Sequence, residues 1–407
     1  MAKKIFISAG EPSGDLHAAN LVSALREHWP DADIQGFGGP RFQSAGGRLL
    51  YPLVELAVMW FGRVLLNMHK FIRLLNQAER VFQNDRPDAV VVIDYPGFHW
   101  VLARRAKKYG IPVFYFVPPQ IWAWAGWRVK KVRAYIDYVL CSLPFEPAWY
   151  RARGVDHAVF VGHPYFDELS ERKVDPAFVA EQTSRGGSIV AILPGSRDQE
   201  IHKNLPMMIE AAKKLAGELP NVRFVVAALH DEHQKLARSM IAASGFEGAI
   251  EVFSGKTAEI VRIADIAWAV SGSVGLELMV EGKPTVVVYK IKPFDLFVAR
   301  RFIKSKYISL VNLLADDEVF PEYLTSRDVS TEMAGRAFEW LTNATARKAA
   351  IARIEVLRER FAHPGAVRRV AAAIVAAIDP CAPTLAGPHG GDRTRRKNER
   401  SGRIAHD

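Results

Sequence analysis

A repeated alternation of short apolar runs with longer amphipathic stretches constrains this fold most strongly. Runs such as AVVVI (89–93) and VFYFV (113–117) are apolar at every position. A strand that is apolar throughout is buried on both faces, which is typical of a parallel sheet covered by helices. Helical patterns at 16–28, 64–82 and 100–109 provide such cover. Further runs of this kind lie at 5–8, 34–37, 138–141 and 159–161.

The alternation restarts after a polar stretch at 171–187, which we interpret as a linker. The second series of apolar runs is 189–193, 224–228, 250–253, 266–270 and 285–289. A chain of 407 residues is too long for one core and long enough for two. We therefore predict an α/β protein made of two similar open units.

Charge and cysteine content narrow the range of partners. The net charge of +10 favours an acidic partner, either a phosphorylated substrate or an anionic membrane surface. Basic motifs of the RNA-binding type, which are interleaved with aromatic residues, are missing, so we expect no nucleic acid partner. Two distant cysteines, Cys141 and Cys381, allow neither a disulfide framework nor a zinc site and fit a reducing cytoplasm. Residues 380–407 are rich in Pro, Gly and Arg, which predicts a disordered basic tail.

Two apolar segments raise the question of membrane contact. The uncharged run 109–127 contains Pro112, Pro118 and Pro119, so we interpret it as a buried strand and an aromatic loop rather than a span. The segment 53–75 has basic residues at helical spacing. It is either an amphipathic element for a lipid headgroup region or an ordinary core helix.

Ligands of open parallel sheets bind at the carboxyl ends of the strands, where polar loops follow the apolar runs. In the first loop, AGEPSGD (9–15), Gly10 and Gly14 permit close backbone approach, and Ser13 or Asp15 can cap the next helix. A tight turn without a ligand explains this loop equally well.

A second loop places Asp94 directly after the wholly apolar strand 89–93. A carboxylate there is partly desolvated, which raises its pKa and suits it to accept a proton from a substrate hydroxyl. The alternative is a helix cap. A third loop clusters Trp122, Trp124 and Trp127 with basic residues, which indicates either a ligand wall or core packing.

Two loops of the second unit predict a nucleotide site. In LPGSR (193–197), backbone N–H groups, a helix N-terminus and the Arg197 guanidinium suit a diphosphate. SGSVGLE (271–277) repeats this arrangement, with Glu277 placed for a ribose diol. The phosphate-loop, G-x-G-x-x-G and HExxH motifs are absent, so we expect no ATP hydrolysis, no NAD cofactor and no catalytic metal.

These loops together resemble the lipid-A-disaccharide synthases, inverting glycosyltransferases of the GT-B fold. The motifs that carry the resemblance are SAGEPSGD (8–15), GFGGPRF (36–42), ELAVM (55–59), IDYPGF (93–98), PPQIWAW (118–124), LPFE (143–146), FVGHP (160–164), LPGSR (193–197), SGSVGLE (271–277) and YISLVNLL (307–314). The chain departs from the family pattern at Trp60, Arg63, Gly97 and Gln120.

The resemblance implies two Rossmann-like domains that face a cleft. It places an acceptor-side domain at 1–170, a UDP-sugar domain at 188–345, and C-terminal helices at 346–379 that complete the fold or exchange in a homodimer. It implies transfer from UDP-2,3-diacylglucosamine to 2,3-diacylglucosamine 1-phosphate, which forms the β-1,6 lipid A disaccharide of lipopolysaccharide and releases UDP. The UDP-sugar is a substrate, and no cofactor is implied.

The resemblance also assigns residues. The catalytic pair is Asp94, as base, and Arg197. The nucleotide-binding candidates are Gly195, Ser196, Ser271, Gly272, Ser273, Glu277 and Asn312. The candidates for the acceptor and lipid side are Gly10, Glu11, Ser13, Gly14, Asp15, Met59, Trp122, Trp124 and His163.

We expect a cytoplasmic enzyme that binds peripherally to the inner membrane of a Gram-negative cell. Three alternatives remain open at this point. The first is another GT-B enzyme acting on UDP-GlcNAc (a 2-epimerase or the peptidoglycan GlcNAc transferase), and the second is a catalytically inactive nucleotide- or lipid-binding protein. The third, an NAD-dependent oxidoreductase, would need the G-x-G-x-x-G motif that this chain lacks.

Overall fold

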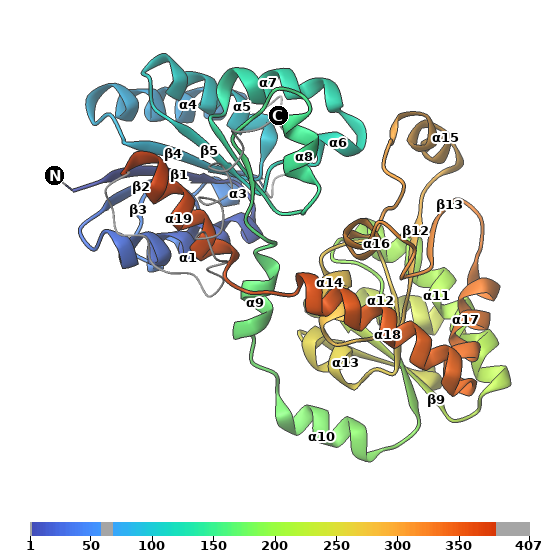
Figure 1. Cartoon of the computed structure of the whole chain (residues 1–407). Coiled ribbons are helices and arrows are strands. Elements are labelled where there is room, and N and C mark those ends of the chain that lie inside the picture. The colour runs from blue at the N-terminus through green and yellow to red at the C-terminus, as the bar shows by residue number, and fades with distance from the viewer. Residues whose placement is uncertain (1, 58–67, 380–407) are drawn as a thin grey trace, which may run out of the picture.

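A computed structural model describes residues 2–57 and 68–379 (Figure 1). It contains two lobes, each built on a parallel sheet flanked by helices. The lobes are joined by α9 (Tyr165–Glu171) and by the stretch between α18 (Ala344–Phe361) and α19 (Ala366–Ile378). The predicted α/β fold with two domains is confirmed. Met59 and the basic tail lie outside the described residues.

The N-terminal sheet has the order β3-β2-β1-β4-β5-β6-β7, with all neighbours parallel. Its strands are β1 (Lys4–Ala9), β2 (Asp33–Phe37), β3 (Arg48–Tyr51), β4 (Ala89–Ile93), β5 (Val113–Phe116), β6 (Tyr138–Cys141) and β7 (Ala158–Phe160). Its helices are α1 (Pro12–His28), α2 (Pro40–Ser44), α3 (Leu53–Ala57), α4 (Met68–Asn84), α5 (Pro96–Lys108), α6 (Ile121–Trp124), the 3-10 turn η2 (Gly126–Arg128), α7 (Val129–Tyr135) and α8 (Glu146–Arg151).

The C-terminal sheet has the order β10-β9-β8-β11-β12-β13 and is also parallel. Its strands are β8 (Ser188–Leu193), β9 (Val222–Ala228), β10 (Ile250–Ser254), β11 (Ile266–Ala269), β12 (Thr285–Lys290) and β13 (Glu322–Thr325). Its helices are α10 (Pro176–Ser184), α11 (Asp198–Glu218), α12 (Asp231–Ala243), η3 (Glu247–Ala249), α13 (Thr257–Ile263), α14 (Val274–Val280), α15 (Pro293–Phe302), α16 (Leu310–Ala315) and α17 (Ser330–Thr342), followed by α18.

The continuous apolar runs are explained by cores on both faces of each sheet. Val90 and Val92 of β4 belong to one buried cluster, whereas Val91 and Ile93 belong to the cluster on the opposite face. Alternate side chains of a strand point to opposite faces, so both sets must be apolar. The strands of the second sheet divide between two clusters in the same way.

Strand order reverses once in each sheet, and this places the polar loops. In the first sheet, strands are added on one side of β1 up to β3 and then on the other side from β4 onward. In the second sheet the same change of direction occurs between β8 and β11. Helices that leave such neighbouring strands on opposite faces open a crevice at the carboxyl edge. The loops after these four strands are AGEPSGD, DYPG, PGSR and SGS, which the sequence had marked as polar.

The last helix returns to the first domain. α19 packs against α1, and Val370 and Ile374 lie in the same buried cluster as Leu21. The N-terminus of α19 is held by the buried Asp167 carboxylate of α9, which accepts hydrogen bonds from the backbone N–H groups of Gly365, Ala366 (3.1 Å) and Val367 (2.9 Å). A carboxylate at this position satisfies N–H groups that have no partner within the helix.

By length and composition, the stretch Ala344–Ile378 is apolar enough to cross a membrane. It is nevertheless two helices, because the helical structure is interrupted between Phe361 and Ala366. The apolar side of α19 is buried against α1. Core packing of α19 therefore accounts for part of this hydropathy.

The structure corrects one expectation and adds three elements that were not predicted. The polar stretch 171–187 contains α10, whose N-cap Asp175 accepts hydrogen bonds from the N–H groups of Ala177 and Phe178. The GFGGPRF motif (36–42), for which no helix was predicted, leads into the short helix α2. The edge strands β3 and β13 were not predicted, because each is only four residues long and partly buried at most positions.

We predict that Asp167→Ala detaches α19 from α1, because three N–H groups lose their shared acceptor in a buried place. The loss should be about 2 kcal/mol or more. Hydrogen exchange would show faster exchange of the α19 amides. The matched control is Glu27→Ala, which removes an exposed 3.2 Å ion pair between α1 and Arg368 of α19 and should have little effect. Equal protection of α19 in both variants would contradict the prediction.

Candidate functional site

The backbone at Asp94 and Tyr95 adopts an unusual conformation. Both residues are left-handed, with φ of 52° and 44°, directly after β4. This conformation costs about 1–2 kcal/mol for each residue with a side chain. The alternative explanation of Asp94 as a helix cap is wrong, because the N-cap of α5 is Tyr95.

Two buried side chains fix the Asp94 carbonyl group. The Tyr115 hydroxyl donates to the Asp94 carbonyl oxygen at 2.9 Å, and His99 Nδ1 lies 2.6 Å from it. A carbonyl oxygen only accepts, so Nδ1 of His99 carries the proton. Burial lowers the pKa of His99 to about 4, and the neutral ring therefore accepts at Nε2 from the Ser8 hydroxyl, 2.9 Å away. This network links β1, β4, α5 and β5 and holds the strained turn.

The pKa of the Asp94 carboxyl group is raised, as the sequence predicted. Burial, and after it the neighbouring Glu11 carboxylate, together raise its pKa from 3.8 to about 6. Glu11 belongs to the loop after β1, so two loops at the reversal of the sheet jointly set this pKa. The result is a carboxylate that ionises near neutral pH, which is the range suited to a general base.

The rest of the first loop surrounds this turn. Gly10 is required for close approach, because a Cβ there would lie 2.4 Å from the Tyr95 ring. Gly14 is buried and Ser13 is exposed. The predicted capping role of Ser13 or Asp15 is wrong, because the N-cap is Glu11 and no side chain caps α1.

Asp15 holds a neighbouring loop instead. Its carboxylate accepts hydrogen bonds from the N–H groups of Gly39 (2.7 Å), Arg41 (3.0 Å) and Phe42 (3.1 Å). These bonds fix the loop after β2 beside the loop after β1. Asp15 therefore organises the edge of the predicted acceptor side, with its oxygens already occupied by the backbone.

In the C-terminal domain, the two predicted phosphate loops line one hollow of about 600 Å³. The predicted residues that line it are Gly195, Ser196, Arg197, Ser271, Gly272, Ser273 and Glu277. The loops follow β8 and β11, which are adjacent at the reversal of the second sheet. A volume of this size is suited to a nucleotide-sized ligand.

Glu200 occupies the groups that would bind an anion there. Its carboxylate accepts from the Ser196 N–H at 3.0 Å and pairs with the exposed Arg197 guanidinium at 3.2 Å. Gly195, with φ of 127°, gives it room, because a Cβ at Gly195 would lie 2.4 Å from the Cβ of Glu200. A bound diphosphate would compete with Glu200 for both donors.

Glu277, which is buried, also lines this hollow. Its Oε2 accepts from the Tyr165 hydroxyl (3.0 Å) and from Arg172 (2.9 Å), both of which belong to the connection between the domains. Burial raises the pKa of Glu277, and Arg172 opposes that rise. Both bonds use Oε2, which leaves Oε1, as far as the described residues go, available to a ribose hydroxyl.

Asn312 supports the site from behind. It is fully buried and does not line the hollow. Its carboxamide donates to Phe320 and Glu322 and accepts from the N–H groups of Val319 and Phe320. Glu322 in turn accepts from the Ile308 N–H, and the Ile308 carbonyl accepts from the Ser271 hydroxyl at 2.6 Å. Asn312 thus positions the SGS turn instead of touching a ligand in the hollow.

The aromatic loop divides between two roles. Trp122 is buried, donates to Glu146 at 2.9 Å and packs edge-on against Phe145, so core packing explains most of it. Trp124 is exposed, with the Arg128 guanidinium 4.5 Å from its ring.

His163 accepts from the Tyr165 N–H, and burial lowers its pKa to about 3, so it is neutral. Met59 lies outside the described residues.

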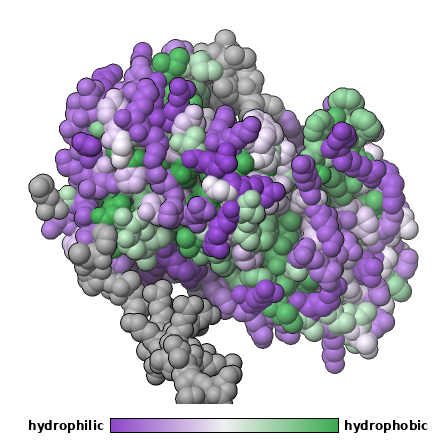
Figure 2. Space-filling view, turned by 45° about the horizontal axis from the view of Figure 1, so that its top comes forward, coloured by the Kyte–Doolittle hydropathy of each residue, from purple (hydrophilic) through white to green (hydrophobic). Residues whose placement is uncertain are grey.

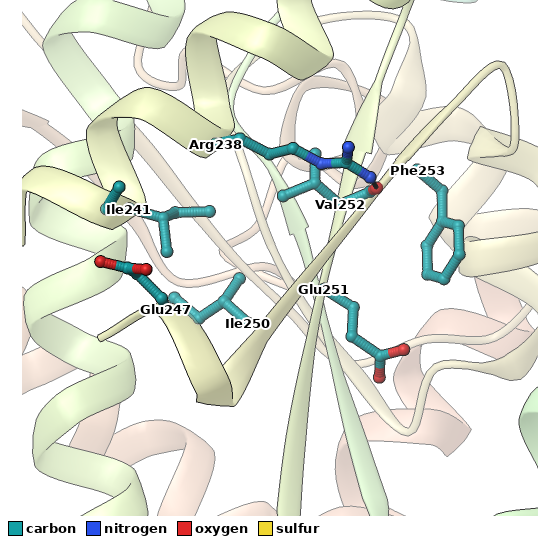
Figure 3. Close-up of a pocket in the computed structure, with 8 residues that line it drawn as sticks. Arg238, Ile241, Glu247, Ile250, Glu251, Val252 and Phe253 are labelled. Atoms are coloured by element: carbon teal, nitrogen blue, oxygen red, sulfur yellow. Dashed lines mark hydrogen bonds between the residues drawn. The ribbon is translucent and has the colours of Figure 1, made fainter. Parts of the chain in front are cut away.

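Two further hollows have different surroundings. One of about 630 Å³ lies between the domains, with Trp122, Phe145 and Trp149 on one side and 304–307 and 313–316 on the other. Another of about 510 Å³ lies beside the edge strand β10 (Figure 3). In that hollow Arg238 donates to the Val252 carbonyl, and Glu251 pairs with Arg185 and Arg223, so its charged groups serve the domain itself. Asp94 lines none of these three hollows.

Sequence reasoning missed Tyr165, Arg172 and Glu200. Tyr165 and Arg172 reach Glu277 across more than 100 residues, and no local pattern signals that contact. Glu200 could have been found, because it stands three residues after Arg197 on a predicted helix, a spacing at which opposite charges pair.

The chain was compared with known proteins. The family model described as lipid-A-disaccharide synthetase matches residues 5–374. A relative from Anaeromyxobacter dehalogenans, named lipid-A-disaccharide synthase, is 36% identical over 372 residues, which cover 91% of this chain and 96% of the relative.

Solved structures share the fold. The UDP-GlcNAc 2-epimerase from Neisseria meningitidis bound to UDP-GlcNAc has a TM-score of 0.62 at 12% identity, covering 92% of this chain and 100% of that one. The calicheamicin glycosyltransferase CalG4 has a TM-score of 0.57 at 12% identity, covering 93% and 100%. At such identities the similarity concerns the two-domain fold.

We predict opposite effects for two neighbouring substitutions in the hollow. Arg197→Ala should weaken UDP binding by about tenfold or more, because a charged donor is lost. Glu200→Gln should strengthen it by about threefold, because a carboxylate that competes for the same donors is neutralised. Titration calorimetry measures both. If both substitutions leave the Kd for UDP unchanged, the hollow is not the diphosphate site.

Proposed function

This chain belongs to the lipid-A-disaccharide synthetase family and is a glycosyltransferase of lipid A biosynthesis; on that premise we propose how its two domains divide the reaction. The donor is UDP-2,3-diacylglucosamine and the acceptor is 2,3-diacylglucosamine 1-phosphate. The acceptor 6-hydroxyl attacks the anomeric carbon of the donor, a β-1,6 bond forms, and the bond to UDP breaks.

The N-terminal domain supplies the general base. Asp94 accepts it from the acceptor hydroxyl as the new bond forms. The turn held by His99 and Tyr115 directs the carboxylate, and Glu11 keeps its proton affinity high. The neighbouring candidates for this acceptor side are Gly10, Ser13, Gly14, Asp15, Trp122, Trp124 and His163, with Met59 outside the described part of the chain.

The C-terminal domain stabilises the negative charge that develops on the departing UDP. The Arg197 guanidinium and the N–H groups of the two loops stabilise the diphosphate as it leaves with the bonding electrons. Glu277 holds the ribose. We propose that these protein groups suffice without a bound metal or other cofactor.

The observation that carries this proposal is the hollow in which Gly195–Arg197 and Ser271–Ser273 meet Glu277. A UDP-release assay with both lipid substrates tests it, with mass spectrometry to identify the acylated disaccharide. UDP binding without a disaccharide would support the inactive binding protein instead. Reaction of unacylated UDP-GlcNAc alone would support an epimerase.

We place the enzyme in the cytoplasm, bound peripherally to the inner membrane, because both substrates carry acyl chains and the chain has a net charge of +10. The segment 53–75 supports this in part. Met68 and Ile72 of α4 are exposed, whereas Leu74 and Leu75 are buried in the core. A homodimer that exchanges the 346–379 segment would preserve the contact that α19 makes with α1 in one chain.

We predict that Asp94→Asn lowers turnover by about two to four orders of magnitude and leaves UDP affinity nearly unchanged, because the amide cannot accept the proton. The control is Asp88→Asn at the amino end of the same strand, where the carboxylate accepts from the Lys4 N–H. Turnover of the control should stay within about threefold of the unmodified enzyme. Near-normal turnover of Asp94→Asn would remove Asp94 from the role of base.

We predict a pH profile limited on its acid side by Asp94. The base works when ionised, so kcat/KM should fall as pH drops through about 6, where the carboxyl group takes up a proton. Glu11→Gln removes a like charge and should move this limb to lower pH. An unmoved limb in Glu11→Gln, measured in overlapping buffers, would show that another group sets it.

A further inference from the structure

The most exposed large apolar side chains of the described residues lie outside the hollows considered so far. Helix α15 presents Phe294 and Phe297, which are 74% and 71% exposed, and ends at Phe302, which is 61% exposed. Figure 1 shows α15 projecting from the C-terminal domain, and Figure 2 shows hydrophobic residues gathered on that projection. Phe is ordinarily among the most buried residue types, so such a group marks an interaction surface.

The helix is anchored to the domain by its other side. Leu296 is buried, and Phe294 and Phe297, three residues apart, lie together on the free side. The residues 290–307 contain six basic side chains and a single acidic one, Asp295. The apolar group therefore lies within strongly positive surroundings.

A second exposed aromatic group adjoins it from the N-terminal domain. Trp124 and Trp127 are 52% and 64% exposed, and the Arg128 guanidinium lies 4.5 and 5.2 Å from their rings. The link between the groups is direct, because the Lys304 N–H just after α15 donates to the Ala123 carbonyl at 2.7 Å. We call Phe294, Phe297, Phe302, Trp124 and Trp127 the α15–Trp surface.

We propose that the α15–Trp surface docks on an anionic lipid bilayer, an inference that rests on the proposed use of acylated substrates. Phe and Trp rings beside Lys and Arg side chains suit the boundary between acyl chains and headgroups, where anionic lipids add electrostatic attraction. A second copy of this chain fits the surface less well, because two such positive patches would repel each other. The surface also borders the interdomain hollow, which Trp122, Lys304 and Lys306 help to line.

Docking there involves both domains. The bilayer would contact the rim of the interdomain hollow from α15 on one side and from α6 and η2 on the other. Lipid substrates could then reach the cleft without leaving the membrane completely.

The test is flotation of the full chain with vesicles of phosphatidylcholine, with and without about one-third phosphatidylglycerol. The variant is Phe294→Ser with Phe297→Ser. The matched control is Val101→Ser with Val356→Ser, which changes two exposed apolar residues of α5 and α18. The α15 variant should lower partitioning onto anionic vesicles by about tenfold or more, while the control retains binding, and added salt should weaken the binding of both the unmodified chain and the control.

Activity separates this proposal from the proposed function. With substrates dispersed in detergent micelles, the α15 variant should release UDP as the unmodified chain does. Failure of the unmodified chain to form disaccharide would contradict the proposed function and leave the vesicle result standing. Unchanged vesicle binding by the α15 variant would overturn the docking proposal. A change from dimer to monomer in light scattering, without a change in vesicle binding, would assign the surface to a second copy of this chain.

Discussion

The reversal of strand order in each sheet is the constraint on which the site depends. At β1 and β4 it brings the loop that carries Glu11 against the turn that carries Asp94, and at β8 and β11 it brings PGSR against SGS. Neither pair is close in sequence. Parallel strands require helical crossovers, and only at the reversal do two adjacent crossovers leave on opposite faces and open a crevice between the loops.

The Asp94 turn shows how such a site stores and balances strain. Two consecutive left-handed residues cost about 1–2 kcal/mol each. The hydrogen bonds of Tyr115, His99 and Ser8 contribute about 1 kcal/mol each and are formed in a buried place where leaving them unmade would cost more. The network therefore nearly offsets the strain. It also explains a buried histidine that the sequence alone leaves without a role.

The pattern of apolar runs was sufficient to predict the two parallel-sheet domains, because strands such as 89–93 are apolar on both faces and cannot be exposed. The glycines and hydroxyl residues that end β8 and β11 similarly predicted which loops line one hollow. Contacts made over a long sequence separation could not be predicted. Arg172 with Glu277, Asp15 with the loop after β2, and Asn312 with Glu322 each depend on how whole elements pack. In each of these cases a polar residue predicted to face a ligand is used, wholly or in part, by the protein itself.

The proposed base and the proposed diphosphate-binding arginine have different local surroundings, and this division suits the proposed displacement reaction. A base needs a carboxylate whose proton affinity is raised by burial and a like charge, which is the situation of Asp94. A leaving diphosphate needs hydrogen-bond donors that can move with it. Arg197 is exposed, and among the residues that the structure describes its guanidinium pairs with Glu200. A single pocket would not suit both groups, because the positive charge that binds the diphosphate would lower the pKa of a carboxylate beside it. In the proposed mechanism the two groups belong to different domains, so the surroundings of each can be set separately.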